Sequence, residues 1–245
     1  MKTSSSFDFL RQPLAYGSFA NLIELLRSSG GFELKYLPKA AYVLGSCLLN
    51  TPTRWLERAR YGAQVERTEI LHPPIFIIGH WRSGTTYIHR LMTQDDNLGF
   101  VWSLQSFSPD TFLSVTSMKA LTPLLAQIFP SKRAMDNVAY AFDVPEEEEY
   151  ALGNLTPLSF YHGWFFPKYL GEHFDRAILF AGVSDKLKET WKRAYVSILK
   201  KTTLHSGGKR LAIKNPANTS RISELLELFP DAKFIHIYRN PYDVY

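Results

Sequence analysis

The residues best suited to chemistry lie between Gly79 and Thr86, where the chain reads GHWRSGTT. A short β-branched run, residues 75–78, precedes this stretch, and a helical apolar pattern follows it. A glycine-bounded loop between a strand and a helix presents backbone N–H groups and the positive end of a helix dipole to an anion. Four side-chain donors share the loop, namely Arg82, Ser83, Thr85 and Thr86. The pattern favours a phosphate-binding loop over a glycine-rich turn that binds no ligand.

The two glycines of this loop, Gly79 and Gly84, have the spacing of the nucleotide-binding motif G-x-x-x-x-G-K-[ST]. Thr85 stands where that motif has the lysine that reaches the β- and γ-phosphates of a nucleoside triphosphate. The cation of this loop is Arg82 instead. A P-loop kinase that acts on a small molecule remains an alternative, and it would need another lysine and a carboxylate that organises Mg²⁺.

A run of four glutamates, residues 146–149, could supply a general base. Asp143 as an N-cap and Pro145 in a first turn predict that a helix begins here, where carboxylates are favourable against the helix dipole. Two interpretations stay open. The run is either a solvated acidic first turn, or one glutamate points inward, because four consecutive helical positions cover every face. In the second case Glu147 or Glu148 would take the proton of an acceptor hydroxyl.

Two further cations stand at the ends of predicted strands. Lys214 closes the run RLAIK before Asn215 and Pro216 break it, and Arg239 follows the apolar run from residue 233 to 238. Open α/β sheets bind ligands at the carboxyl ends of their strands. The amphipathic helix predicted over 184–201, which lies between these motifs, is interpreted as scaffold.

Three elements together resemble the sulfotransferase family, whose members transfer a sulfuryl group from 3′-phosphoadenosine 5′-phosphosulfate (PAPS) to an acceptor. The string G-x-x-R-S-G-T-T resembles the loop that binds the 5′-phosphosulfate, I-K-N-P resembles the family's lysine element, and Y-R-N-P-Y-D-V resembles its 3′-phosphate element. The resemblance covers residues 73–245. It implies an α/β fold with a parallel sheet flanked by helices, related to P-loop nucleotide-binding folds.

The resemblance implies a role for each matching residue. The 5′-phosphosulfate would be bound by Arg82, Ser83, Gly84, Thr85 and Thr86. Lys214 would lie near the transferring sulfuryl group and would stabilise its developing charge together with Arg82. Arg239 would pair with the 3′-phosphate, because a planar guanidinium binds phosphate oxygens at two points.

The sequence departs from the family where a catalytic base is usually found. Cytosolic members place a histidine two residues after the lysine, where this chain has Pro216. Other members carry a glutamate soon after the loop helix, where this chain has the segment Ser103–Gln105. The acidic run therefore offers the candidates for the base, and Glu147 and Glu148 are the leading ones. In the family, a partner serine follows the arginine of the 3′-phosphate element. The matching position would lie beyond Tyr245, so we expect a sulfotransferase-like domain that is incomplete at its C-terminus. A nucleotide-binding protein without catalysis is a further alternative.

Length and composition place limits on the organisation. A chain of 245 residues with 45% hydrophobic residues can bury one sizeable core and an appended segment. We expect a helical extension over residues 1–70, which packs on the rest or offers a face to a partner or membrane surface, and an incomplete sulfotransferase-like domain over 71–245. The net charge of +5 suits a polyanionic ligand. The sequence shows no motif for binding nucleic acid, so we expect no nucleic-acid partner.

The remaining expectations concern environment and acceptor. A single cysteine, Cys47, excludes an intramolecular disulfide, and the seven histidines show no metal-ligand spacing, so no metal is required. The N-terminus lacks the apolar core of a signal peptide and no run is long enough to span a membrane, which predicts a cytoplasmic protein. Two aromatic clusters, within residues 100–112 and 160–166, either cap the core or line an apolar acceptor pocket. A small molecule, lipid or carbohydrate that offers a hydroxyl (or amine) would be compatible.

Overall fold

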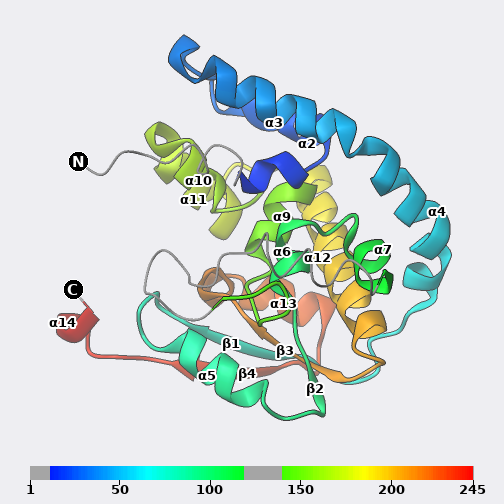
Figure 1. Cartoon of the computed structure of the whole chain (residues 1–245). Helices are drawn as coiled ribbons and strands as arrows, with labels where there is room; N and C mark the ends of the chain where they lie inside the picture. Colours follow the sequence, from blue (N-terminus) through cyan, green and yellow to red (C-terminus); the bar gives the residue numbers. More distant parts are fainter. Residues whose placement is uncertain (1–11, 119–139, 245) are drawn as a thin grey trace.

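A four-stranded parallel sheet forms the base of the molecule in the computed structural model, which describes residues 12–118 and 140–244 (Figure 1). The strand order is β2-β3-β1-β4. The strands are β1 (Ile75–Gly79), β2 (Leu98–Gly99), β3 (Arg210–Lys214) and β4 (Lys233–Ile237). The predicted strands at 75–78, 210–214 and 233–238 are confirmed to within one residue, whereas β2 was not predicted because two residues leave no periodic pattern.

The register of the sheet sets the position of the predicted ligand residues. Ile77 of β1 pairs with Lys214 of β3, and Gly79 pairs with Ile237 of β4. Because all pairings are parallel, the loop after β1, Lys214 at the end of β3 and the segment after β4 lie along one edge of the sheet. The sheet therefore brings all three sequence motifs to the same edge.

Helices cover both faces of the sheet (Figure 1). The short helix α5 (Thr85–Met92) lies on one face, and α12 (Asp185–His205) crosses the other. The Ser184 side chain caps α12 by accepting a hydrogen bond from the Leu187 N–H, as the sequence predicts. The main core lies between α12 and the sheet and includes Phe76, Leu152, Trp191, Tyr195, Ile198, Leu211 and Ile213.

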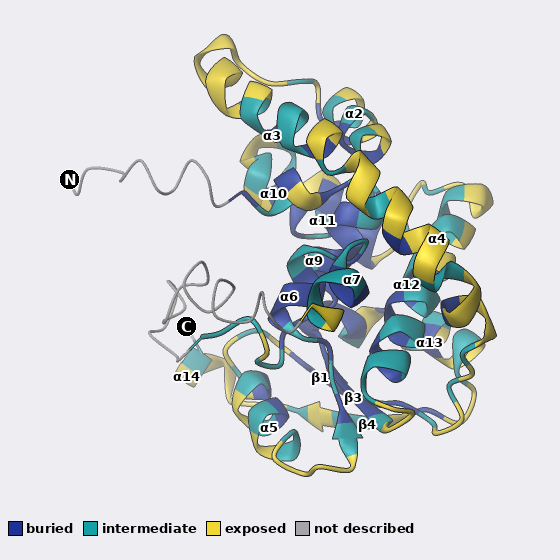
Figure 2. Cartoon of the chain, turned by 45° about the vertical axis from the view of Figure 1, so that its right-hand side comes forward, coloured by how far each residue is buried: buried dark blue, intermediate teal, exposed yellow. Residues whose placement is uncertain are grey.

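The N-terminal helices lie over the layer of helices that covers the sheet, farthest from the strands (Figure 1). They are α2 (Phe19–Ser28), α3 (Leu37–Leu49) and α4 (Thr51–Arg67), with short 3-10 turns η1 (Pro13–Tyr16) and η2 (Leu34–Tyr36). Leu22, Val43 and Cys47 form a small apolar cluster within this segment. Much of the outer surface of α3 and α4 is exposed (Figure 2). The helical character predicted for this region is confirmed over its described part.

Side chains and backbone groups tie the N-terminal helices to the rest of the chain. The Asn21 amide donates to the carbonyl of Gly153 at 2.8 Å. Glu57 of α4 is buried and pairs with Lys201 of α12 at 2.7 Å. These contacts hold the segment to the rest of the chain, while the large apolar side chains of Leu49, Trp55 and Leu56 remain exposed.

The remaining helices connect and support these layers. They are α6 (Ser103–Phe107), α7 (Phe112–Ser117), α9 (Glu149–Leu155), α10 (His162–Phe165), α11 (Leu170–Ile178), α13 (Ile222–Leu228) and α14 (Pro241–Val244), with the 3-10 helices η4 (Pro167–Tyr169) and η5 (Pro216–Ser220). The helices η5 and α13 follow one another between β3 and β4. Among the described residues, no helix is both long enough and apolar enough to cross a bilayer.

The helix predicted to begin at Pro145 starts later. Helix α9 begins at Glu149, and Glu148 is its N-cap. Pro145 instead forms an isolated antiparallel bridge with Trp102. This bridge keeps residues 144–146 extended against the start of α6, and the acidic run enters the molecule as a loop before it becomes helical. Long-range pairing has overridden a local helix signal.

Candidate active site

The loop between β1 and α5 has a backbone suited to an anion. Arg82 and Gly84 adopt left-handed conformations, with φ of 69° and 98°, and Gly84 caps α5. Such turns create concave sites lined by N–H groups, next to the positive end of a helix dipole. Gly79 has φ of 142°, and an added Cβ would lie 2.1 Å from the carbonyl oxygen of Ile237. The close approach of β4 therefore requires glycine at the start of the loop.

Lys214 stands beside this loop and pairs with Glu147. The Lys214 ammonium donates to Glu147 Oε1, and the Tyr161 hydroxyl donates to Glu147 Oε2. Both charged residues are nearly fully buried. Glu147 and Lys214 form an ion pair that is shielded from solvent. The structure thus places a carboxylate and a cation together at the ligand-binding edge of the sheet.

His89 packs behind Lys214 from the helix α5. Its Nε2 lies 3.1 Å from the carbonyl oxygen of Ala212, and the ring is buried. Burial and the nearby Lys214 ammonium lower the pKa of His89 to about 3. This imidazole is therefore neutral at physiological pH, and it adds no second positive charge next to Lys214.

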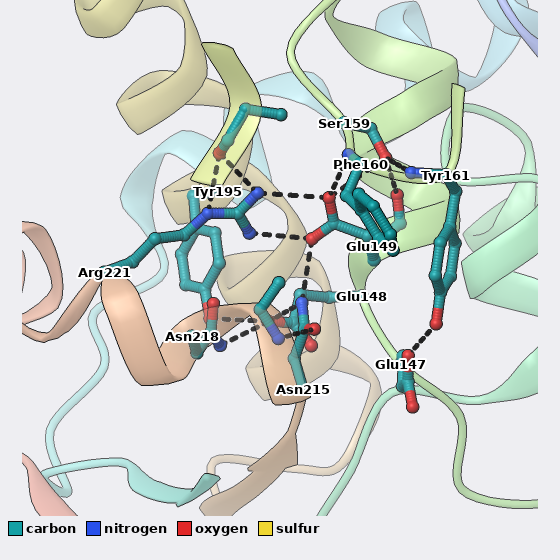
Figure 3. Close-up of polar contacts among 12 residues, drawn as sticks. Glu147, Glu148, Glu149, Ser159, Phe160, Tyr161, Tyr195, Asn215, Asn218 and Arg221 are labelled. Atoms are coloured by element: carbon teal, nitrogen blue, oxygen red, sulfur yellow. Dashed lines mark hydrogen bonds and ion pairs between the residues drawn. The ribbon is translucent and has the colours of Figure 1, made fainter. Parts of the chain in front are cut away.

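Glu148 belongs to a polar network with Tyr195 and Asn218 (Figure 3). Its Oε1 accepts hydrogen bonds from the Tyr195 hydroxyl at 2.8 Å, the Asn218 amide at 2.7 Å and the Asn215 amide at 3.2 Å. Its Oε2 has no hydrogen-bond partner among the described residues. Burial raises the pKa of Glu148 to about 7, against an ordinary value of 4.5. The two glutamates proposed as bases therefore occupy different environments.

Glu149 forms the third carboxylate site of the run. Arg221 binds its two oxygens at 2.7 and 3.1 Å, and the Asn215 amide donates to it at 2.8 Å (Figure 3). Burial opposes the charge of Glu149, but Arg221 outweighs burial and lowers the pKa of this carboxyl. The bidentate pair joins α9 to the segment that precedes α13.

The burial of all four glutamates decides between the two interpretations of the acidic run. Glu146 and Glu147 are each 6% exposed, and Glu148 and Glu149 are 0% exposed. A solvated acidic first turn is therefore wrong. The glutamates point inward, as the second interpretation expected. The reason is not that they cover every face of a helix, because residues 146–148 precede the helix.

The two aromatic clusters have different locations. Trp102 and Phe112 pack with Phe142 and His205 around a core near α7. The second cluster lies beside the loop, because Phe160 contacts Trp81 with ring centroids 5.3 Å apart. Its residues Phe160, Tyr161 and Trp164 are extended by rings from other segments, namely Trp81, Tyr150, Phe174 and, from the first cluster, Phe107. The core interpretation thus fits most of the first cluster, and the second lies next to Glu147 through Tyr161.

The other predicted ligand residues lie around the same edge. Ser83 and Thr86 are half-buried, Thr85 is buried, and Arg82 is exposed. Arg239 is exposed and follows β4 by two positions, next in register to the loop after β1. The described residues contain no group of three or more His, Cys, Asp or Glu side chains arranged to hold a metal ion.

Sequence reasoning missed several residues that shape this site. Tyr161 was recognised only as a member of an aromatic cluster, and Trp81 and His89 were given no role. Tyr161 lies 14 positions from Glu147, so only the folded chain reveals their hydrogen bond. Asn215, directly after the strand-end lysine, also had no assigned role, although polar residues at that edge commonly contact functional groups.

The fold and the site define a class of protein, an open parallel α/β structure with an anion-binding loop after its central strand and strand-end cations beside it. A family model described as "Sulfotransferase family" matches residues 73–245. The chain therefore belongs to the sulfotransferase family.

Relatives and solved structures agree with this assignment. Omega-hydroxy-beta-dihydromenaquinone-9 sulfotransferase Stf3 of Mycobacterium tuberculosis, and the protein of the same name from Mycobacterium bovis, are 34% identical over 185 residues, which cover 76% of this chain. The match covers 46% of each relative, so the chain spans about half the length of these curated relatives.

Two sulfotransferase crystal structures share the fold. STF1 from Mycobacterium tuberculosis H37Rv aligns with a TM-score of 0.54 and 18% identity, over 97% of this chain and 63% of that one. STF9 from Mycobacterium avium aligns with a TM-score of 0.56 and 17% identity, over 94% and 64% of the two chains. At 17–18% sequence identity, the similarity to these two structures supports the fold of this chain.

Proposed function

We propose that this protein is a sulfotransferase that transfers a sulfuryl group from PAPS to an acceptor hydroxyl. The observation that carries the proposal is the buried pair of Lys214 and Glu147 beside the anion-binding loop. This pair supplies a cation for the transferring group and a carboxylate for the acceptor proton within one site. Membership of the family supports the same reaction.

The donor would bind along the ligand-binding edge of the sheet. The left-handed loop backbone and the amino end of α5 suit its 5′-phosphosulfate. The residues proposed to bind this group are Arg82, Ser83, Gly84, Thr85 and Thr86. Arg239, after the neighbouring strand, is proposed to bind the 3′-phosphate.

The proposed reaction forms a bond between the acceptor oxygen and sulfur and breaks the bond between sulfur and the bridging oxygen of the phosphate. The acceptor proton passes to Glu147, and the negative charge of the leaving bisphosphate is stabilised by Lys214 and Arg82. The Tyr161 hydroxyl holds the Glu147 carboxylate in position. This scheme needs no metal ion.

Glu147 is the stronger of the two candidate bases. Its carboxylate contacts Lys214, whereas the Glu148 carboxylate is fully enclosed by Tyr195, Asn215 and Asn218. We assign Glu148 a positioning role, because it holds the segment after β3 against α12.

A hydroxyl on a largely apolar molecule is the proposed acceptor. The second aromatic cluster adjoins Glu147 through Tyr161, and it offers ring surface rather than charge. The curated relatives are named for an omega-hydroxylated dihydromenaquinone, which is a lipid alcohol. Both observations favour a lipid over a carbohydrate.

The test combines donor binding with product formation. A ligand that binds only the native state raises the unfolding temperature. We expect adenosine 3′,5′-bisphosphate to raise it and Mg²⁺-ATP to leave it unchanged, and we expect sulfur-35 from labelled PAPS to appear in a lipid alcohol. Stabilisation by Mg²⁺-ATP alone would overturn the proposal in favour of a kinase.

The Arg82→Ala variant tests the donor site directly. Because Arg82 is exposed, the variant should fold normally. It should lose most of the stabilisation by adenosine 3′,5′-bisphosphate and at least 90% of turnover, on the order of the loss of one charge-assisted contact. Arg58→Ala, which removes an exposed arginine from α4, is the matched control. Equal stabilisation of both variants would contradict the assignment of Arg82.

A further inference from the structure

A cavity of about 700 Å³ lies between the N-terminal helices and the segment from α10 to η4. Its volume is in the range of small-molecule sites. One wall comes from α2 and α3 through Leu22, Leu26, Val43 and Leu44. The opposite wall comes from Trp164, Phe165 and Phe166. No step of the proposed reaction uses this space.

The burial of the lining residues distinguishes the inner end of the cavity from its opening. Leu22 and Val43 are buried, which places them at its inner end. Phe32 and Tyr36 are 40% and 49% exposed, and the charged Lys39 near them is also exposed. Apolar side chains line much of the interior together with the buried polar residues Gln12 and Ser29, and the rim is amphipathic. Such a space suits a ligand that has a long apolar body.

Trp164 connects this cavity to the candidate active site. One face of its ring stacks on Tyr161, with centroids 4.2 Å apart and an interplanar angle of 22°. Tyr161 in turn donates its hydroxyl proton to the Glu147 carboxylate. The same Trp164 lines the cavity and is 41% exposed. Trp164 therefore links the cavity lining to Glu147 through one intervening residue, Tyr161.

We propose that this cavity binds the apolar chain of the acceptor, so that a hydroxyl at one end of the chain meets Glu147. This inference rests on the proposed function and names the part of the molecule that selects the acceptor. Residues 12–44 supply most of the cavity wall, which gives the N-terminal segment a role in substrate selection in addition to packing. The expected substrates are linear or polyprenyl alcohols rather than sugars.

Ala40 and Ala41 offer a matched pair of variants for the test. Both lie on α3, but Ala40 lines the cavity whereas Ala41 is exposed and does not line it. Ala40→Phe should fill the space, and Ala41→Phe should leave it open. Ala40→Leu is a smaller substitution to use if the Phe variant does not fold, as judged by circular dichroism.

The first measurement compares 1-dodecanol with 1-butanol as acceptors of sulfur-35 from labelled PAPS. Because each buried methylene contributes about 0.8 kcal/mol, the parent should show a kcat/KM at least 100-fold higher for dodecanol. Ala40→Phe should lower kcat/KM for dodecanol at least tenfold and leave that for butanol within twofold. Ala41→Phe should leave both values within twofold. Loss of both activities to the same degree in Ala40→Phe, or no chain-length preference in the parent, would overturn the inference.

A second measurement separates this inference from the proposed function. Calorimetry without PAPS should show that dodecanol binds to the parent and to Ala41→Phe, with a negative heat-capacity change, and at least tenfold more weakly to Ala40→Phe. If that binding pattern is found but no alcohol is sulfated, the sulfotransferase proposal fails and the cavity assignment stands. If alcohols are sulfated but dodecanol binds all three proteins equally, the cavity assignment fails and the function stands.

Discussion

Glu147, the residue proposed to take the acceptor proton, is held by two neighbours. The Lys214 ammonium donates to one oxygen of its carboxylate, and the Tyr161 hydroxyl donates to the other and fixes its orientation. Burial raises the pKa of Tyr161 well above its ordinary value, and the Glu147 charge raises it further. The phenol therefore keeps its proton and remains a donor to Glu147 across the physiological range.

Glu147→Gln is expected to lower kcat by a factor of about 100 to 10,000, because an amide cannot accept the proton. Binding of adenosine 3′,5′-bisphosphate should change less than threefold. Tyr161→Phe removes a hydrogen bond from the same carboxylate but keeps the base, so kcat should fall by a smaller factor, about tenfold. Steady-state kinetics with titration of the bisphosphate measures both effects. Full activity in Glu147→Gln would exclude this residue as the base.

At the scale of elements, the buried carboxylates hold helices to the sheet. Glu147 joins the loop before α9 to β3, Glu148 joins it to α12, and Glu149 joins α9 to the segment before α13. Each bond links elements that are distant in sequence. The acidic run therefore organises the layer that lies against the ligand-binding edge of the sheet.

The Glu148 network predicts a specific dependence of stability on pH. The pKa of Glu148 is about 7 in the folded chain and near 4.5 when unperturbed, so the folded state binds this proton more tightly. The free energy of unfolding should therefore fall as the pH rises from about 4.5 to 7, by an amount on the order of 3 kcal/mol. Glu148→Gln stays neutral and should lack this loss.

Urea denaturation of the parent and of Glu148→Gln at pH 5 and pH 8 measures the difference. The variant should gain stability relative to the parent at pH 8. Glu172→Gln, which alters an exposed glutamate of α11, should follow the parent. A parallel pH dependence in all three proteins would show that Glu148 does not hold a proton at neutral pH.

Arg221→Met tests the contribution of the bidentate pair. Arg221 is fully buried, and its side chain also donates to the carbonyl of Ala177 at 2.6 Å. Its loss leaves the Glu149 charge buried without its cation, so the free energy of unfolding should fall by about 3–5 kcal/mol. Thermal unfolding of Arg221→Met and of the double variant with Glu149→Gln measures the effect. The double variant should recover part of the loss, and a neutral result for Arg221→Met would contradict the assigned role.

At the scale of the whole molecule, the N-terminal helices form a layer with a small core of its own. Leu22, Val43 and Cys47 are buried within it. The buried Glu57 anchors α4 by pairing with Lys201 and by accepting the Ser114 N–H at 3.0 Å. The separation into a helical extension over residues 1–70 and a domain over 71–245 stays a prediction.

Hydrogen exchange should reveal whether this layer opens separately from the sheet. Glu57→Ala removes the nearer carboxylate partner of Lys201 and leaves Asp110 at 3.9 Å, so the opening free energy of α4 amides should fall by about 1–3 kcal/mol. Amides of β1 and β3 should keep their protection. Glu66→Ala is the control on the same helix, since Glu66 is exposed and only its backbone carbonyl accepts from Lys200. An equal loss across all elements would show that the layers unfold together.

The sequence predicted the sheet better than it predicted the site. Strands such as Arg210–Lys214 were found because a buried parallel strand is a short apolar run with clear boundaries. The loop from Gly79 to Thr86 was found because its chemistry lies within eight neighbouring residues. The different environments of Glu147 and Glu148 could not be predicted, because they depend on hydrogen-bond partners at positions 161, 195 and 214.

The acidic run also bears on the order in which the molecule can be completed during synthesis. The partners of Glu147, Glu148 and Glu149 lie 67, 47 and 72 residues further along the chain. A nascent chain that has left the ribosome only as far as α9 cannot bury these carboxylates, because an unpartnered charge is too costly to dehydrate. The centre of the molecule therefore stays open to water until residues 195–221 have emerged.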